Sequence, residues 1–355
     1  MIIVKNIFIY IALASSFLLL FYTINQAYLA VLYNKYRLNK KSNNTSEVPD
    51  PPDKWPSVLV QLPVYNEPLV VERLVRAVSK FDYPSNLLTV QVLDDSNDGT
   101  SDIVAPLIRE LTGAGLNIKH IRRGNRDGYK AGALRYGMQQ DSSEFIAIFD
   151  ADFIPDPDFI KKTIAYFQSP DVALVQTRWL HLNANESLLT SLLAFAIDSH
   201  FSVEQGGRQA GGYFTNFNGT AGILRRRAIE ESGGWQDDCL TEDLDLSFRL
   251  QLNGWQIRFV EEISTPSELP ANMSAIKSQQ FRWTKGACET AKKNLYDLWK
   301  SDKSLMTRFI GSMHVLNSCA FLLMFVTSLC TIPILLLTDL LDAKLIILML
   351  AAQTG

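Results

Sequence analysis

The chain has 355 residues, which is enough for one sizeable globular domain and additional elements. Its formal net charge is −3 and charged residues make up 20% of the sequence, so we expect no nucleic-acid partner. The apolar residues are distributed unevenly along the chain, and this distribution is more informative than their total.

The first expected element is an apolar segment, residues 7–33, that contains no formally charged residue. At about 1.5 Å per residue it is long enough to cross a hydrocarbon core about 30 Å thick. A cleaved signal peptide is the alternative, but its basic region would contain only Lys5, and the Ala-x-Ala triplet at residues 12–14 lies inside the apolar run. We therefore expect a transmembrane helix over residues 1–34 and a linker over residues 35–55.

The next part of the chain alternates short β-rich runs with helical patterns. This alternation predicts an α/β domain with a parallel, doubly wound sheet over residues 56–262. In such sheets ligands bind beyond the carboxyl ends of the strands, and two acidic clusters fall there. The expected strands are residues 57–62, 88–93, 117–121 and 144–149, and the expected helices are residues 68–80, 101–113 and 130–140.

A second apolar run covers residues 311–337, and a third begins at Leu345. The stretch from Leu345 to Gly355 is too short to span a bilayer, so we expect a membrane protein whose C-terminal end is missing. We assign residues 263–310 to helices at the membrane interface and residues 311–355 to a second membrane region.

Basic residues cluster on the sides of the two apolar runs that face the middle of the chain. Lys and Arg are enriched on the cytoplasmic flanks of membrane helices. We therefore expect an integral membrane protein with its N-terminus outside and residues 34–310 in the cytosol. The flanking residues are Lys35, Arg37, Lys40 and Lys41 after the first run and Lys292, Lys293, Lys300, Lys303 and Arg308 before the second.

Two aspartates, Asp150 and Asp152, directly follow the expected strand 144–149. Carboxylates at positions i and i+2 of an extended segment point the same way and could hold one cation. Mg²⁺ and Mn²⁺ prefer hard oxygen ligands, and Mg²⁺ usually binds one or two carboxylates together with substrate phosphates. An Asp-rich turn is the alternative, but the position after a buried strand favours a metal site.

Asp94 and Asp95 end the expected strand 88–93 and could accept hydrogen bonds from a nucleotide base or ribose. A capped turn explains them equally well. Lys130, in the segment Gly-Tyr-Lys-Ala-Gly, could supply a positive charge to a phosphate. On its residues alone, that segment is better explained as a solvated basic loop before a helix.

The triplet Thr241-Glu242-Asp243 begins an amphipathic run. A threonine N-cap with acidic residues in the first helical turn would explain all three residues without any function. The functional interpretation makes Asp243 a general base that takes a proton from an acceptor hydroxyl.

Gln279, Arg282 and Trp283 have the spacing i, i+3 and i+4, so they share one helix face. Arginine can neutralise a diphosphate through two hydrogen bonds, and tryptophan offers a flat apolar surface to a sugar ring. A Trp/Arg anchor at a membrane interface is the alternative.

Taken in order, the segments DDS, DAD, TED and QQFRW resemble the D, DxD, TED, QxxRW series of family 2 glycosyltransferases with a GT-A fold, specifically the processive β-glycan synthases. The resemblance covers roughly residues 55–287 and is nearest to the cellulose synthase-like A and C proteins, which make mannan or glucan backbones. Other similar segments are VQLPVYNE, GYKAGAL, VQTRW and FNGTAG. The resemblance implies a GT-A domain inserted between transmembrane helices.

The resemblance also implies roles for the donor-side residues. Asp94 and Asp95 would contact the nucleoside, and Lys130 would meet the phosphates of the donor. Asp150 and Asp152 would bind the nucleotide and a divalent metal, Mg²⁺ or Mn²⁺, with Asp152 as the main ligand.

On the acceptor side, the resemblance makes Asp243 the catalytic base. Gln279 and Arg282 would hold the diphosphate, and Trp283 would hold the acceptor sugar. The other residues expected near the acceptor are Phe217, Asn218, Gly219, Thr220 and Glu242.

The reaction implied by the resemblance is a single in-line displacement at the anomeric carbon, with inversion of configuration. The expected donor is GDP-mannose or UDP-glucose, and the expected acceptor is a growing β-linked polysaccharide at a plasma, inner or Golgi-type membrane. The alternative is a non-processive transferase that makes a glycolipid from ceramide or diacylglycerol, and the length of the product distinguishes the two.

Overall fold

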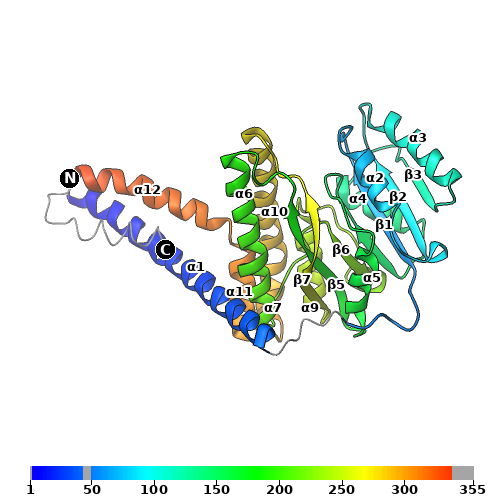
Figure 1. Cartoon of the computed structure of the whole chain (residues 1–355). Coiled ribbons are helices and arrows are strands. Elements are labelled where there is room, and N and C mark those ends of the chain that lie inside the picture. The colour runs from blue at the N-terminus through cyan, green and yellow to red at the C-terminus, as the bar shows by residue number, and fades with distance from the viewer. Residues whose placement is uncertain (1, 43–48, 338–355) are drawn as a thin grey trace.

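The computed structural model describes residues 2–42 and 49–337 of the chain. An α/β domain carries two long helices that extend away from it (Figure 1). The domain contains a seven-stranded sheet with the order β3-β2-β1-β4-β6-β5-β7. Its strands are β1 Val58–Val64, β2 Leu88–Asp94, β3 Ile118–Ile121, β4 Phe145–Ile148, β5 Val172–His181, β6 Gly222–Arg225 and β7 Gln256–Ser267.

Helices cover both faces of the sheet because alternate strand residues point to opposite faces. In β1, Val58, Val60 and Leu62 pack into one core cluster, and Leu59 packs into the other. The first cluster includes residues of α2 Val71–Val78, α3 Thr100–Gly113 and α5 Phe159–Ile164, and the second includes residues of α4 Tyr129–Met138, α8 Arg226–Glu231 and α9 Glu242–Leu252. Two short 3-10 helices, η1 Ser85–Leu87 and η2 Ala165–Phe167, complete this part of the fold.

The expected all-parallel sheet is wrong at β6, which runs antiparallel to both β4 and β5. A parallel strand requires a crossover that carries the chain back to the end of the sheet where the previous strand began. After β5 the chain forms α6 Leu188–Ser199, the π-helix η3 His200–Gln205 and α7 Gly206–Gly211. It then enters β6 from the end of the sheet at which β5 finished. The loop before β6, residues 217–220, therefore lies at the carboxyl edge of β4.

The first helix, α1, covers Ile2–Ser42, so residues 35–42 of the expected linker are helical. The helix continues because its last turns are fixed to the domain: Tyr33 donates a hydrogen bond of 2.8 Å to Glu261, and Lys40 forms an ion pair with Glu262. Residues 43–48 of the expected linker lie outside the described residues.

The second apolar segment is bent. Residues 311–337 do not form one helix, because α11 Leu305–Val315 and α12 Cys319–Leu337 meet at an angle of 67°. The break contains Asn317, which accepts a hydrogen bond of 2.7 Å from Tyr22 of α1 instead of continuing the helix. The expected apolar run from Leu345 lies outside the described residues.

The two long helices pack together through an apolar cluster that includes Ala12, Cys330 and Ile334, and they extend side by side from the domain (Figure 1). By length and composition, residues Ile3–Lys41 are long and apolar enough to cross a membrane. The bent pair α11–α12 would be a second span if its two helices are taken together.

Strand β7 continues to Ser267, so the expected domain end at residue 262 falls inside a strand. The chain then enters α10 Met273–Lys300, whose N-terminus is capped by the Asn272 side chain. Helix α10 packs against α9 and α11, which places it between the sheet and the long helices α1 and α12 in Figure 1.

Candidate active site

The polar residues selected from the sequence gather at the carboxyl edge of the sheet. Strand β2 ends at Asp94, and Asp150 follows the end of β4. Because β6 is antiparallel, the loop 217–220 returns to the same edge, next to the N-terminus of α9. Three chain segments that are far apart in the sequence therefore meet at one place.

Lys130, in the first turn of α4, ties these segments together. Its ammonium group donates to Asp150 Oδ1 at 2.5 Å and to the carbonyl oxygen of Gly219 at 3.0 Å. The backbone N–H of Asp150 also donates to the Thr220 hydroxyl at 2.9 Å. Lys130 is thus an ordered part of the site, and the alternative of a solvated basic loop is wrong for this residue.

The acidic groups next to Lys130 crowd one another. Burial, reinforced by the neighbouring Asp150 carboxylate, raises the pKa of Asp152 to about 7. Burial and the charges of Asp150 and Asp98 raise the pKa of Glu67 in the same way. A divalent cation would relieve this repulsion, so the hard-oxygen donor set fits Mg²⁺ or Mn²⁺.

The fit has a limit that matters for the chemistry. Within residues 2–42 and 49–337, no group of three or more His, Cys, Asp or Glu side chains is placed to hold a metal ion. Asp150 and Asp152 would therefore bind a cation together with oxygens from a phosphate or from water. That sharing is typical of Mg²⁺ at phosphate-binding sites.

Asp243 lies in the first turn of α9 and faces the same centre. Its Oδ1 accepts a hydrogen bond of 2.8 Å from the Leu244 N–H. Burial raises the pKa of Asp243 and, together with the charge of Asp243, raises the pKa of Glu242, although Lys130 opposes both shifts. A carboxyl group with a raised pKa is a stronger base, as general-base chemistry requires.

The alternative of a threonine-capped helix is wrong in one respect. The Thr241 side chain makes no capping hydrogen bond, and its hydroxyl instead lies 3.3 Å from the Thr290 hydroxyl of α10. The acidic residues of this turn are therefore placed by packing against α10, and the cap does not account for them.

The loop 217–220 has a backbone that only glycine suits at its centre. Gly219 has a φ of +81°, and a Cβ there would lie 3.0 Å from Asp243 Oδ2 and 3.4 Å from Lys130 Nζ. Left-handed backbone is costly for residues with a Cβ. Gly219 thus allows the loop to approach both charged groups.

Two residues of this loop do not lie at the surface of the site as expected. Phe217 is fully buried in the core, and Thr220 is also buried, so their side chains cannot touch an acceptor. The Phe217 N–H donates to the Ser247 hydroxyl at 2.9 Å. Both residues hold the loop in place, which leaves Asn218 and Gly219 as the members that face the site.

Asp94 also lies beneath the site. Its carboxylate is fully buried and accepts hydrogen bonds from the Ser96 N–H, the Ser101 hydroxyl and His120. Although burial disfavours the charge, these hydrogen bonds hold the pKa of Asp94 well below its ordinary value. The expected direct contact between Asp94 and a nucleoside is therefore wrong, because its oxygens are already used by the protein.

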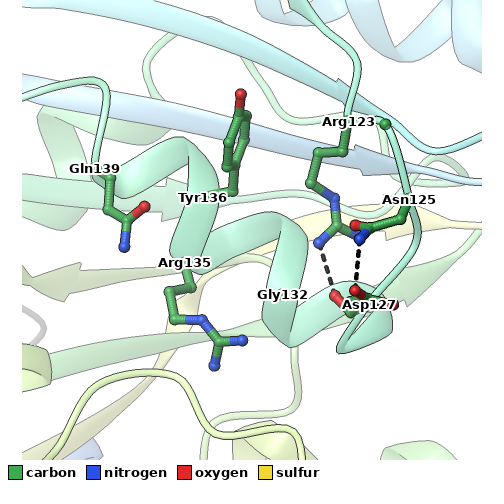
Figure 2. A pocket seen from close by; sticks show the side chains of 8 residues that line it. Arg123, Asn125, Asp127, Gly132, Arg135, Tyr136 and Gln139 are labelled. Carbon is green, nitrogen blue, oxygen red and sulfur yellow. Dashed lines mark hydrogen bonds between the residues drawn. The ribbon is translucent and has the colours of Figure 1, made fainter.

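Asp95 is paired with Arg123, whose Nε donates to Asp95 Oδ1 at 2.9 Å. Arg123 and Asp127 also line a small pocket of about 230 Å³ beside α4 (Figure 2). That volume is below the roughly 300–1,000 Å³ typical of ligand sites. We therefore assign no ligand to this pocket and regard Arg123, which lines it, as a residue that holds the loop 122–128 in place.

The residues of the QxxRW segment lie on α10, one turn before its contact with α9. Gly286 approaches Thr241 so closely that a Cβ there would lie 2.5 Å from the threonine side chain. The Leu240 N–H donates to Glu289 at 2.8 Å. Arg282 and Trp283 are exposed near this contact, and their roles toward the donor and acceptor, with that of Gln279, stay predictions.

Sequence reasoning assigned no role to two groups at the donor side. In addition to burial, the charge of Asp150 raises the pKa of Glu67, and the charge of Glu67 in turn raises the pKa of Asp152. The Arg126 guanidinium lies 3.2 Å from the centre of the Tyr65 ring. Tyr65 and Glu67 belong to the segment VQLPVYNE, so the family resemblance already included this segment, although it assigned neither residue a role.

Comparison with known proteins agrees with this geometry. A family model described as "Glycosyltransferase like family 2" matches residues 56–286. The chain is 40% identical over 283 residues to "Glucomannan 4-beta-mannosyltransferase 7" of Arabidopsis thaliana, which covers 75% of this chain and 51% of the relative. It is 40% identical over 273 residues to "Glucomannan 4-beta-mannosyltransferase 1" of Cyamopsis tetragonoloba, covering 74% of this chain and 50% of the relative. The chain spans about half the length of these relatives.

Solved structures show the same fold. The mannosyltransferase PcManGT from Pyrobaculum calidifontis, in complex with GDP-Man and Mn²⁺, superposes with a TM-score of 0.68 at 18% identity, over 98% of this chain and 92% of that one. S. aureus TarS 1-349 in complex with UDP-GlcNAc gives a TM-score of 0.53 at 16% identity, over 74% and 72% of the two chains. The expected GT-A fold is confirmed. With the family model matching 231 of 355 residues (56 to 286), the chain belongs to the family 2-like glycosyltransferases.

Proposed function

We propose that this chain transfers mannose from GDP-mannose to the end of a growing β-linked polysaccharide, with inversion at the anomeric carbon. The observation that carries the proposal is the meeting of Asp243, Lys130 and Asp150 around Gly219. The carboxylate proposed as the base for the acceptor and the lysine proposed to meet the donor phosphates thus lie close together. The names of the related proteins favour mannose over glucose.

The chain's own residues perform two tasks in this mechanism. Asp243 accepts the proton of the acceptor hydroxyl while that oxygen forms its bond to the anomeric carbon. The bond from that carbon to the diphosphate oxygen breaks at the same time, and the electron pair leaves with the nucleoside diphosphate. Lys130, and Arg282 from α10, offset the negative charge that grows on the leaving group.

Asp150 and Asp152 would hold a divalent cation, Mg²⁺ or Mn²⁺, in the loaded enzyme. When bound, this cation supplies further positive charge for the diphosphate. Asp150 is then shared between the cation and Lys130, which already contacts it at 2.5 Å. Trp283 would offer its indole face to the acceptor sugar.

We place the chain in a membrane through α1 and through the bent pair α11–α12. The basic residues in the last turns of α1 and along α10 support a cytosolic α/β domain and an N-terminus outside. A plasma or Golgi-type membrane fits a polysaccharide product. Labelling of Cys288, an exposed cysteine of α10, tests this arrangement: an impermeant thiol reagent added to intact cells should not reach it.

The test of function is a transfer assay on membranes that contain the whole protein. Radiolabelled GDP-mannose and UDP-glucose are supplied separately, and the products are sized and digested with an enzyme specific for β-linked mannan. We expect a labelled polymer from GDP-mannose that the enzyme degrades. One labelled sugar per lipid would support the glycolipid alternative, and no product from either donor would refute the proposal.

A further inference from the structure

A chain of hydrogen bonds connects membrane helix α1 with the loop 217–220. Gln26 of α1 donates to Glu204 Oε1 at 3.1 Å, and Glu204 Oε2 contacts His200 Nδ1 at 2.9 Å. The other ring nitrogen of His200 lies 3.4 Å from Asn218 Oδ1. We call these four residues the His200 chain.

The His200 chain starts at an irregular point of the fold. His200 and Glu204 lie in the π-helix η3, between α6 and α7. Single turns of π-helix inside α-helical segments are rare in proteins, and those that occur often lie at functional sites. Here the π-helix contains both His200 and Glu204, whose side chains contact each other.

The direction of each hydrogen bond follows from its neighbours. Arg208 has only donors, so the Asn216 atom that meets its guanidinium at 3.2 Å is the amide oxygen. The amide nitrogen of Asn216 therefore donates to Asn218, whose accepting atom is Oδ1. His200 Nε2 faces the same oxygen at 3.4 Å, so the tautomer with a hydrogen on Nε2 would donate to it.

The other ring nitrogen, Nδ1, faces Glu204. Although burial opposes ionisation, the contacts with His200, Arg208 and Gln26 lower the pKa of Glu204 to about 2, so it is a carboxylate. A carboxylate only accepts, so His200 Nδ1 donates to it. An apolar side chain in place of His200 could make neither contact, because it has no hydrogen-bonding group.

The far end of the His200 chain lies at the proposed acceptor side. Asn218 directly precedes Gly219, the residue that approaches Asp243 and Lys130. The amide nitrogen of Asn218 is buried and has no hydrogen-bond partner among the described residues. A buried donor without a partner is unfavourable, and an acceptor such as a sugar hydroxyl would satisfy it.

We propose that His200 is a positioning residue for the acceptor sugar and that it acts through Asn218. By holding Asn218 Oδ1, it directs the amide nitrogen toward the acceptor end of the polysaccharide beside Asp243. Glu204 fixes the ring, and Gln26 ties it to α1. This inference rests on the proposed transferase function and adds a determinant of acceptor binding to it.

The test is a double-mutant cycle on the full chain in membranes or detergent. His200→Phe, Asn218→Ala and the double variant are assayed with GDP-mannose and a soluble β-linked mannose oligosaccharide. We expect each single variant to lower kcat/KM for the oligosaccharide by up to about tenfold, the upper end of the range for one hydrogen bond between neutral groups. The KM for GDP-mannose should change less than about twofold, and the double variant should be no worse than Asn218→Ala alone.

Two controls keep the result decisive. Ser191→Ala, in α6, removes a side-chain hydrogen bond to the carbonyl oxygen of Ala184 outside the His200 chain and should leave all constants unchanged. If His200→Phe does not accumulate, His200→Gln, which retains donors, replaces it and should act like a weakened His200. Additive losses, or an equal loss for the donor, would overturn the inference. An inactive wild-type protein would instead contradict the proposed function.

Discussion

Replacing Asp243 by asparagine should abolish sugar transfer and leave donor binding nearly intact. The amide preserves the shape of the side chain, and its oxygen can still accept the hydrogen bond from the Leu244 N–H. It is a very poor proton acceptor at neutral pH, so the acceptor hydroxyl loses its base. General-base catalysis contributes about 10²–10⁴-fold, and we expect a loss of kcat in that range.

The structure sets a small stability effect for the same substitution. Asp243 lies in the first turn of α9, where loss of a negative charge costs about 0.3–1 kcal/mol through the helix dipole. Its removal also takes away one of the acidic groups that face Lys130, but Lys130 keeps its contacts with Asp150 and Gly219. The variant should therefore remain folded and should still bind nucleotide.

The assay compares initial rates of transfer with equilibrium binding of GDP-mannose, both on the folded variant. Asp102→Asn is the matched control, because Asp102 lies in the first turn of α3, is exposed, and has no place in the site. It should lose the same small stability and no activity. A folded Asp243→Asn protein with more than about a tenth of the normal rate would refute the assignment of the base.

Three further predictions follow from the same site. Removal of divalent cations by a chelator should stop transfer, and Mn²⁺ or Mg²⁺ should restore it, because a cation at Asp150 and Asp152 would offset the diphosphate charge and would have no third His, Cys, Asp or Glu ligand among the described residues to retain it; full activity in excess chelator would contradict this. Since the raised pKa of Asp243 means that its proton is lost at a higher pH than usual, kcat should fall with acidification at a midpoint above the value of about 4 for an ordinary aspartate, as a pH–rate profile would show. Gly219→Ala should cost about 1–2 kcal/mol of stability in thermal unfolding and lower the transfer rate at least tenfold, because its Cβ would press on Asp243; wild-type kinetics would show that the loop is not near the base.

The sequence predicts the early strands and the acidic edge well because both depend on local patterns. The apolar runs that become β1, β2 and β4 lie between turn-forming residues, and the aspartates follow them. The antiparallel direction of β6 was not predictable in this way. It depends on where the chain lies after α7, which is a property of the tertiary structure.

The roles of single residues show the same division. Phe217 belongs to a recognisable motif, yet its side chain fills the core beneath Gly222. Asp94 lies at the carboxyl end of β2 as expected, but its carboxylate oxygens accept hydrogen bonds from Ser96, Ser101 and His120. A motif indicates that a position matters, and only the packed structure shows whether its side chain meets a ligand or another part of the protein.

The reversed strand β6 also divides the work of the site between two stretches of chain. The segment from β1 to the loop after β4 carries Glu67, Lys130, Asp150 and Asp152, the residues proposed for the donor side. The later segment carries the loop 217–220, the base and α10. In the proposed mechanism, acceptor recognition lies in the later segment alone, whereas donor binding draws on both segments, because Arg282 of α10 would contact the diphosphate. A chimera joined within β5 should therefore take its acceptor from the relative that supplies the later segment, while both relatives should influence its affinity for the donor.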